Sequence, residues 1–253
     1  MSHASTSVRR KLLLTAAACT LASPAFAWSF GGETVNGSGK VRTEARKVEH
    51  FTGIEVSVPG DVELRVGSSE GVSIESDDNI LPLIETKVDG RTLEIRVARR
   101  KLNLHPHTLR ITVNAKEIDH VDLAGSGSIS ADTLRARNFK ASVSGSGSIK
   151  ARAIEGDNLA ISIAGSGDMT ADGGNMKQVK ISIAGSGDVD IGKLKAADVK
   201  VNTSGSGNST VWASSALDVS VAGSGDVNYY GEPRISRSVM GSGDVKRLGA
   251  SPR

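Results

Sequence analysis

The fold is decided by one stretch, Val179-Lys180-Ile181-Ser182-Ile183-Ala184-Gly185-Ser186-Gly187-Asp188-Val189-Asp190-Ile191. On each side of its Gly-Ser-Gly turn, apolar and polar residues alternate with period two, which is typical of half-buried β-strands. The same turn recurs at spacings of 20 and then 18 residues, with copies that begin at Gly125, Gly145, Gly165, Gly185, Gly205, Gly223 and Gly241. This regularity predicts a repeat protein.

The residues that flank the turn repeat too. Alignment of the copies gives apolar rows, in which Thr203 and Ser209 are polar exceptions. The row at the start of each copy holds Phe139, Leu159, Val179, Val199, Leu217 and Ile235. The row after the turn holds Ile129, Ile149, Met169, Val189, Val227 and Val245. One such unit is too small to bury its own apolar side, whereas a stack of units buries a continuous core.

The period predicts an all-β chain that folds as a parallel β-helix, a single-stranded solenoid with coils of 18–20 residues. Propeller blades need about 40 residues and leucine-rich repeats have their own consensus, so both fit less well. An antiparallel meander stays open as an alternative, because hairpin turns also use glycine. In a coil, Gly-Ser-Gly would allow positive φ or close backbone approach at a corner.

We expect a single domain over residues 46–249, in which 46–118 is a degenerate N-terminal part and 119–249 carries the regular repeats. Ile54-Glu55-Val56 and Gly60-Asp61-Val62-Glu63-Leu64 match the repeat with a shortened turn.

Three further features qualify the ends of this domain. Asp89-Gly90 predicts a hairpin. Residues 28–45 are predicted to form an N-terminal linker or a first loose strand. In the last copy, Arg237 falls in an otherwise apolar row, which indicates a charged cap on the end of the solenoid.

Residues 1–27 are predicted to be a signal peptide. Arg9-Arg10-Lys11 is followed by a short apolar stretch and by Ala25-Phe26-Ala27, an A-x-A cleavage site, so that cleavage between Ala27 and Trp28 is expected. Lipidation at Cys19 is the alternative, although Ala16-Ala17-Ala18 before it lacks the usual leucine. We expect export to the periplasm, the cell surface or the medium of a Gram-negative-type bacterium, with no transmembrane segment in the mature chain.

Composition excludes several classes of function. The chain has 31 basic and 28 acidic residues, and removal of the signal peptide leaves 28 of each, so no basic excess argues for nucleic acid as a partner. The single cysteine lies within the signal peptide, so the mature chain has no disulfide, thiolate metal site or cysteine nucleophile. Aromatic residues make up 3% of the chain, so the core must use Val, Ile, Leu and Ala.

Three stretches resemble one bacterial family. They are Arg46-Lys47-Val48 through Phe51-Thr52-Gly53-Ile54-Glu55-Val56, then Asp78-Asn79-Ile80-Leu81-Pro82-Leu83-Ile84-Glu85, and then the serial Gly-Ser-Gly-Asp turns. The family is described as putative autotransporter adhesin head domains, or GIN domains, and the likeness spans roughly residues 46–249. It implies a right-handed parallel β-helix in the cell envelope and no established activity. No further repeats follow the last copy, so we expect export or anchoring to depend on another component.

Four aspartates follow their turns at one equivalent position: Asp168, Asp188, Asp226 and Asp244. Equivalent residues of adjacent coils lie about 4.8 Å apart, so Asp168 and Asp188 would be close like charges. A cation, outward rotation or solvent relieves such repulsion. Calcium binding by the four aspartates is therefore a hypothesis. A solvated row of turn residues is the alternative that we favour, because calcium sites gather more than two carboxylates. No other cofactor is expected.

Catalysis would need acids that converge on one face with a base or acid partner. Asp190 with Asp188, and Asp172 with Asp168, could line such a groove, although alternation also produces an ordinary solvated strand face. His105-Pro106-His107 is the only local histidine pair, and an exposed loop explains it better than a metal site does.

The best interpretation is a non-enzymatic exported envelope protein, an adhesin or scaffold that binds a polysaccharide or an envelope protein through a repetitive β-face. The alternative is a carbohydrate-active enzyme, a polysaccharide lyase or hydrolase, on a β-helix. The identity of the ligand and the oligomeric state stay open.

Overall fold

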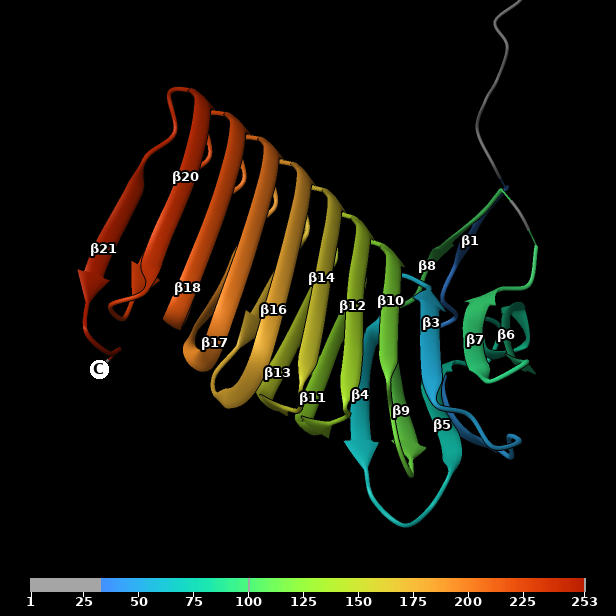
Figure 1. Cartoon of the computed structure of the whole chain (residues 1–253). Coiled ribbons are helices and arrows are strands. Elements are labelled where there is room, and N and C mark those ends of the chain that lie inside the picture. Colours follow the sequence, from blue (N-terminus) through green and yellow to red (C-terminus); the bar gives the residue numbers. More distant parts are fainter. Residues whose placement is uncertain (1–32, 100, 253) are drawn as a thin grey trace, which may run out of the picture. The chain divides into compact units, whose positions relative to one another are not determined.

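A computed structural model describes residues 33–99 and 101–252. The predicted signal peptide, its cleavage site between Ala27 and Trp28, and Cys19 lie outside these residues. From His120 onward the chain winds into stacked coils, each with one strand before and one after the Gly-Ser-Gly corner (Figure 1). Strands before the corner form the first face, and strands after it form the second face.

The first face contains β10 (His120–Gly125), β12 (Asn138–Gly145), β14 (Asn158–Gly165), β16 (Gly174–Gly185) and β20 (Arg234–Gly241). The second face contains β11 (Ser128–Arg135), β13 (Ser148–Glu155), β15 (Asp168–Ala171), β19 (Val227–Tyr230) and β21 (Val245–Gly249). Two long strands, β17 (Val189–Gly205) and β18 (Ser209–Gly223), begin on the second face and continue into the first face of the next coil.

Neighbouring coils pair in parallel along both faces, which confirms the parallel solenoid and excludes the antiparallel meander. Phe139 lies opposite Leu159, which is 20 residues on, and Val199 lies opposite Leu217, which is 18 residues on. The coil shortens through register shifts between Asp190 and Asp198, where β17 pairs with β18. The apolar rows predicted from the sequence therefore become ladders of neighbours inside the solenoid.

The core contains almost no large rings. Each coil contributes buried aliphatic side chains such as Ile161, Ile163 and Ile181. The two predicted exceptions are also inside: Thr203 is 3% and Ser209 is 1% exposed, and neither hydroxyl has a hydrogen-bond partner among the described residues. These two buried hydroxyls lose hydration without compensation.

The corner is where successive coils approach most closely. The Ser186 N–H donates to the Gly165 carbonyl at 2.8 Å, and the bond recurs from coil to coil. Gly185 has φ +133°, and a Cβ there would lie 2.2 Å from the Gly165 oxygen. A Cβ on Gly187 would lie 2.1 Å from the Gly167 oxygen. Both glycines of the motif are therefore required by contact between backbones, and the first also by its φ.

The first coil is formed by β3 (Gly53–Ser57) and β4 (Asp61–Val66), which pair with β10 and β11. Val56 lies opposite Leu123 and Val62 lies opposite Ile129, so both turns have the same length. The prediction of a shortened turn was wrong. Val58-Pro59-Gly60 replaces Gly-Ser-Gly at full length, and its sequence concealed the match.

The N-terminal coils do not stack in chain order. Beyond β3 and β4 lie β7 (Thr92–Val97) and β9 (Leu109–Ala115), which pair with them in parallel and form an outer coil. Antiparallel strands then cover this coil: β6 (Ile84–Asp89) on β7, β5 (Gly71–Asp77) on β9, and β2 (Val41–Arg46) on β5. A 3-10 turn, η1 (Leu81–Leu83), precedes β6. The degenerate part is thus both coil and cap.

The β6–β7 hairpin turns at Asp89-Gly90, as predicted, with Gly90 at φ +61°. The predicted linker needs correction. Residues 41–46 form β2, and β1 (Glu33–Asn36) pairs in parallel with β8 (Leu102–His105). The described part of 28–45 therefore belongs to the compact unit, because its backbone is paired with strands far along the chain.

Asp77 ties this cap together from a fully buried position. Its carboxylate accepts from the N–H groups of Gly39 at 2.7 Å and His107 at 2.8 Å. Burial raises the pKa of Asp77, but these N–H groups and the His107 ring together hold the pKa below its ordinary value. His107 therefore has a structural partner, which the sequence did not reveal.

The opposite end of the stack is open. β20 pairs only with β18, and β21 only with β19, among the described strands. Arg237 lies exposed opposite the buried Val219, as expected for a charged residue in the last coil. Three exposed apolar side chains, Ile235, Met240 and Leu248, lie in this coil because no further coil covers them.

Substitution of Gly185 by Ala should destabilise the solenoid by about 2–4 kcal/mol, because the new Cβ meets the backbone of the previous coil at an unfavourable φ. Urea unfolding of the chain measures this change. Ser186→Ala is the matched control, since it leaves the corner backbone bond intact. Equal stability of the two variants would contradict the role assigned to the corner glycine.

Substitution of Thr203 by Val should stabilise the protein by about 1 kcal/mol, because it removes a buried hydroxyl that has no partner. Valine has the shape of threonine and is the residue type at Val201 and Val221 beside it. The urea midpoint should rise without a change in slope. Thr133→Val, at a half-buried position on the second face, is the control and should change little. A lower midpoint for Thr203→Val would show that the hydroxyl has a bonding partner.

Candidate functional site

The predicted calcium residues form a hydrogen-bonded ladder on the exposed edge of the second face. Asp168 Oδ1 accepts from the Asp188 N–H at 3.1 Å, and Asp188 Oδ1 accepts from the Asn208 N–H at 2.7 Å. Asn208 Oδ1 accepts from the Asp226 N–H, and Asp226 Oδ1 accepts from the Asp244 N–H. Each side chain therefore binds the backbone of the next coil.

This ladder explains why the row changes from serine to Asp and Asn. Where the row holds Ser148, the next N–H, that of Asp168, donates to the Gly147 carbonyl instead. From Asp168 onward the side chain supplies the acceptor. Asn208 also donates its Nδ2 to Asp188 Oδ1 at 3.0 Å, which places a neutral amide between Asp188 and Asp226.

Calcium binding to this row stays a prediction. Among residues 33–99 and 101–252, no group of three or more His, Cys, Asp or Glu side chains has an arrangement that could hold a metal ion. The ladder accounts for one oxygen of each carboxylate that has a following coil, and the row is exposed to solvent.

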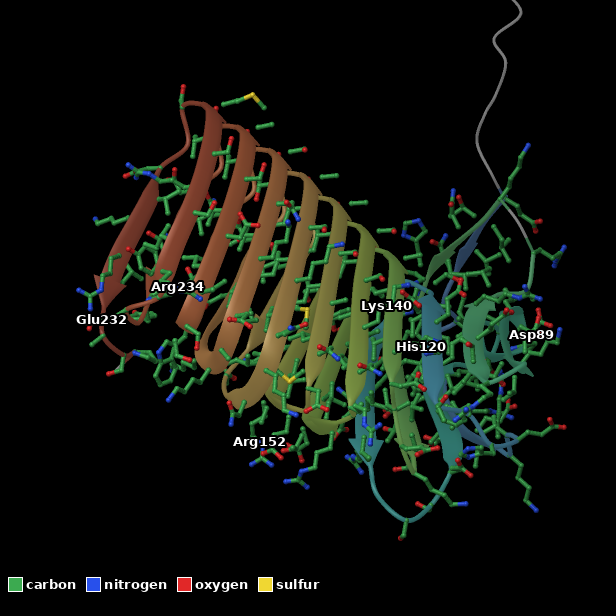
Figure 2. All side chains as sticks on the ribbon, viewed as in Figure 1. Asp89, His120, Lys140, Arg152, Glu232 and Arg234 are labelled. Carbon is green, nitrogen blue, oxygen red and sulfur yellow. The ribbon has the colours of Figure 1, made fainter. Side chains whose placement is uncertain are left out.

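A shallow groove of about 710 Å³, the first-face groove, runs across the strands of the first face. It crosses six coils, a length of about 24 Å at 4.8 Å per coil. Its surface is mostly apolar, with charged side chains such as Lys180, Lys200 and Asp218 beside it. Arg234 lines its end in the last coil (Figure 2). The lining residues are Asn138, Phe139, Asn158, Leu159, Ala160, Gln178, Val179, Lys180, Asp198, Val199, Lys200, Ala216, Leu217, Asp218, Arg234, Ile235 and Ser236.

The groove has this form because small residues interrupt rows of longer side chains. Ala160 lies between Lys140 and Lys180 in the register of the first face. Closer to the corner, the outward residues Ser142, Ser162 and Ser182 are small and leave a flat surface.

The acids considered for catalysis divide between two places. Asp168 and Asp188 belong to the ladder, whereas Asp172 and Asp190 line one pocket of about 510 Å³, the second-face pocket. The sequence pointed to these two acids, but not to Gly192, Lys193 and Tyr230, which line the same pocket. Tyr230 comes from a later coil and lies in a stretch without the standard pattern, so no local signal could find it.

These features define a class of protein: a β-solenoid with a continuous aliphatic core, which presents long repetitive surfaces for binding. The chain belongs to the family described as putative auto-transporter adhesin, head GIN domain, which it matches over residues 50–233. This confirms the resemblance found in the sequence. Membership suggests an envelope or surface protein.

Similar solved structures carry related descriptions. A putative adhesin from Bacteroides fragilis is 24% identical, with a TM-score of 0.79, 85% of this chain covered and 100% of that chain. A putative lipid binding protein from Parabacteroides distasonis is 26% identical, with a TM-score of 0.71 and the same coverage of 85% and 100%. A putative adhesin from Parabacteroides merdae, at 20% identity and a TM-score of 0.65, shares the fold over 86% of this chain and 100% of its own.

No curated protein matches the chain. The descriptions of the family and the similar structures suggest a protein that is not an enzyme. In the part of the chain that the structure describes, no helix is long and apolar enough to cross a membrane.

Substitution of Asp188 should separate the structural role of the ladder from a charge role. Asp188→Ala removes the acceptor for Asn208 and should lower the melting temperature, whereas Asp188→Asn keeps an acceptor and should leave it unchanged. Thermal unfolding measures both. Equal losses in the two variants would show that the charge, not the hydrogen bond, stabilises the row.

The same variants test the calcium hypothesis. Calorimetric titration of the wild-type chain with calcium should give heat that Asp188→Asn abolishes if the row binds the ion. An absence of heat with the wild-type chain would remove the hypothesis.

Proposed function

We propose that this chain is the non-enzymatic binding head of an exported adhesin or scaffold in the bacterial envelope, and that it binds through the first-face groove. The observation that carries the proposal is a mostly apolar groove across six coils. An extended ligand can contact equivalent side chains on successive coils, so weak contacts add along its length. The adhesin description of the family supports this function.

The groove favours a long partner over a small metabolite. It is open along its length, and its charges alternate in sign, with Lys200 and Asp218 paired at 3.1 Å. A polysaccharide chain or an extended segment of an envelope protein matches this shape and charge. The name of the Parabacteroides distasonis structure adds a third candidate, because an apolar groove also accommodates an acyl chain.

A carbohydrate-active enzyme is the second candidate function. The observation that favours it is the presence of Asp172 and Asp190 in one pocket, since glycosidases use paired carboxylates. Release of shortened product from a bound polysaccharide separates this function from binding alone.

Ala160→Glu should weaken ligand binding at least tenfold. The longer side chain fills the middle of the groove, and Lys140 and Lys180 on either side can accommodate its charge. Binding is measured with the purified mature protein on three immobilised probes: envelope polysaccharide, envelope protein and phospholipid vesicles. Ser162→Glu is the control, because it adds the same charge on the same strand outside the groove.

Equal binding by the two variants would exclude the groove. Export is checked in the same strain, where the mature protein should begin at Trp28. Retention of the full chain in the cytoplasm would contradict an envelope role.

A further inference from the structure

The second-face pocket lies on the other face of the solenoid and has a different chemistry from the first-face groove. Its floor follows one outward row of the parallel register, in which Lys150, Thr170, Asp190 and Thr210 are successive neighbours. Leu248, Ser251 and Pro252, from the end of the chain, also line it. Polar groups therefore come from five successive coils and meet in one concavity of about 510 Å³. This volume is typical of small-ligand sites.

Gly192 keeps the pocket open. A Cβ at this position would lie 2.8 Å from Thr210 Cγ2 and 3.4 Å from Tyr230 Cε2. Gly192 is absent from the glycines with positive φ, so the backbone here does not require glycine. The missing side chain instead leaves room between the threonine methyl group and the tyrosine ring.

The backbone of Gly192 also positions an acid. Its N–H donates to Asp190 Oδ1 at 3.1 Å. This bond holds the Asp190 carboxylate beside the space that Gly192 leaves. The second oxygen of a carboxylate can then accept a hydrogen bond from a ligand.

The charges that line the pocket balance. Asp172 and Asp190 are matched by Lys150 and Lys193, and Lys150 Nζ lies 3.7 Å from Asp172 Oδ2. A phosphate or carboxylate ligand would meet the two acids, and a cation would meet the two lysines. A neutral ligand with many hydroxyl groups can donate to the carboxylates and accept from the ammonium groups and threonine hydroxyls.

Tyr230 supplies the apolar surface of the site. It is half-buried on β19, opposite Trp212 of β18, whose ring carries the Lys195 ammonium at 5.6 Å from its centroid. Aromatic rings are scarce in this chain, so one in a polar pocket is informative. A tyrosine ring is flat and apolar with a polar hydroxyl at its edge. A pyranose has the complementary form, with an apolar C–H face and hydroxyl groups around its rim.

We propose that the second-face pocket binds a neutral saccharide unit, with Tyr230 contacting the sugar ring and Asp172, Asp190, Lys150 and Lys193 bonding its hydroxyl groups. This site goes beyond the proposed adhesin function, because it names a ligand class and a location apart from the first-face groove. It provides a second point of attachment to a glycan-bearing surface.

The experiment titrates the mature protein with neutral methyl pyranosides and their disaccharides, by calorimetry and by saturation-transfer NMR. We expect at least one neutral sugar to bind at millimolar or lower concentration. Tyr230→Ala and Asp190→Asn should each weaken it about tenfold or more, because one removes the ring and the other a charged acceptor. Asparagine can still accept from the Gly192 N–H, so Asp190→Asn preserves the local backbone.

Gly192→Val should abolish binding by filling the pocket, and circular dichroism checks its fold. If this variant does not fold, Tyr230→Ala and Asp190→Asn still decide the outcome. Ala160→Glu is the matched control and should bind the sugar like the wild-type chain. Its failure to do so would place the sugar in the first-face groove and overturn the proposal.

Two further results would overturn the proposal: no binding of any neutral sugar, or binding of anionic sugars alone. Loss of sugar binding in the pocket variants, together with unchanged binding of envelope probes, would support the saccharide site independently of the adhesin proposal. Release of a shortened product would support the pocket as a sugar site and contradict the non-enzymatic role.

Discussion

The structure depends on the contact between successive Gly-Ser-Gly corners. The Ser186 N–H donates to the Gly165 carbonyl at 2.8 Å, and the glycines on either side have no room for a Cβ. This close contact places every coil at the same height above the last, so equivalent residues on both faces come into register. A bulkier corner would separate the coils locally, and the ladders of both faces would lose their alignment. The corner thus sets the geometry of the core and of the surface together.

The same register builds the functional surfaces. Because side chains alternate along each strand, an inward row such as Phe139 and Leu159 has an outward row beside it, with Lys140 and Ala160. The ladder through Asp188 follows from this alignment, since each carboxylate reaches the N–H of the equivalent residue one coil on. The groove and the pocket likewise arise where the side chain of an outward row is short or absent.

The regular coils could be predicted because each repeats the information of its neighbours: the period sets the coil length, and alternation sets the core. The N-terminal part could not. Val58-Pro59-Gly60 shares only one glycine with the corner motif, and the outer coil of β7 and β9 stacks out of chain order. Asp77 bonds with residues about 30 to 38 positions away. For the pocket, alternation pointed to Asp172 and Asp190, but Tyr230 joins them from a coil whose sequence departs from the repeat.

The division of labour between inward and outward residues explains why the fold does not identify the ligand. Relatives that are 24% and 26% identical superpose with TM-scores of 0.79 and 0.71, yet one is described as an adhesin and the other as a lipid binding protein. The fold requires aliphatic inward rows and corner glycines, and exposed substitutions away from special features change stability little. Outward positions such as Ala160, Gly192 and Tyr230 are therefore free to differ between members. Binding specificity in this solenoid must be sought in the residues that its repeat pattern does not constrain.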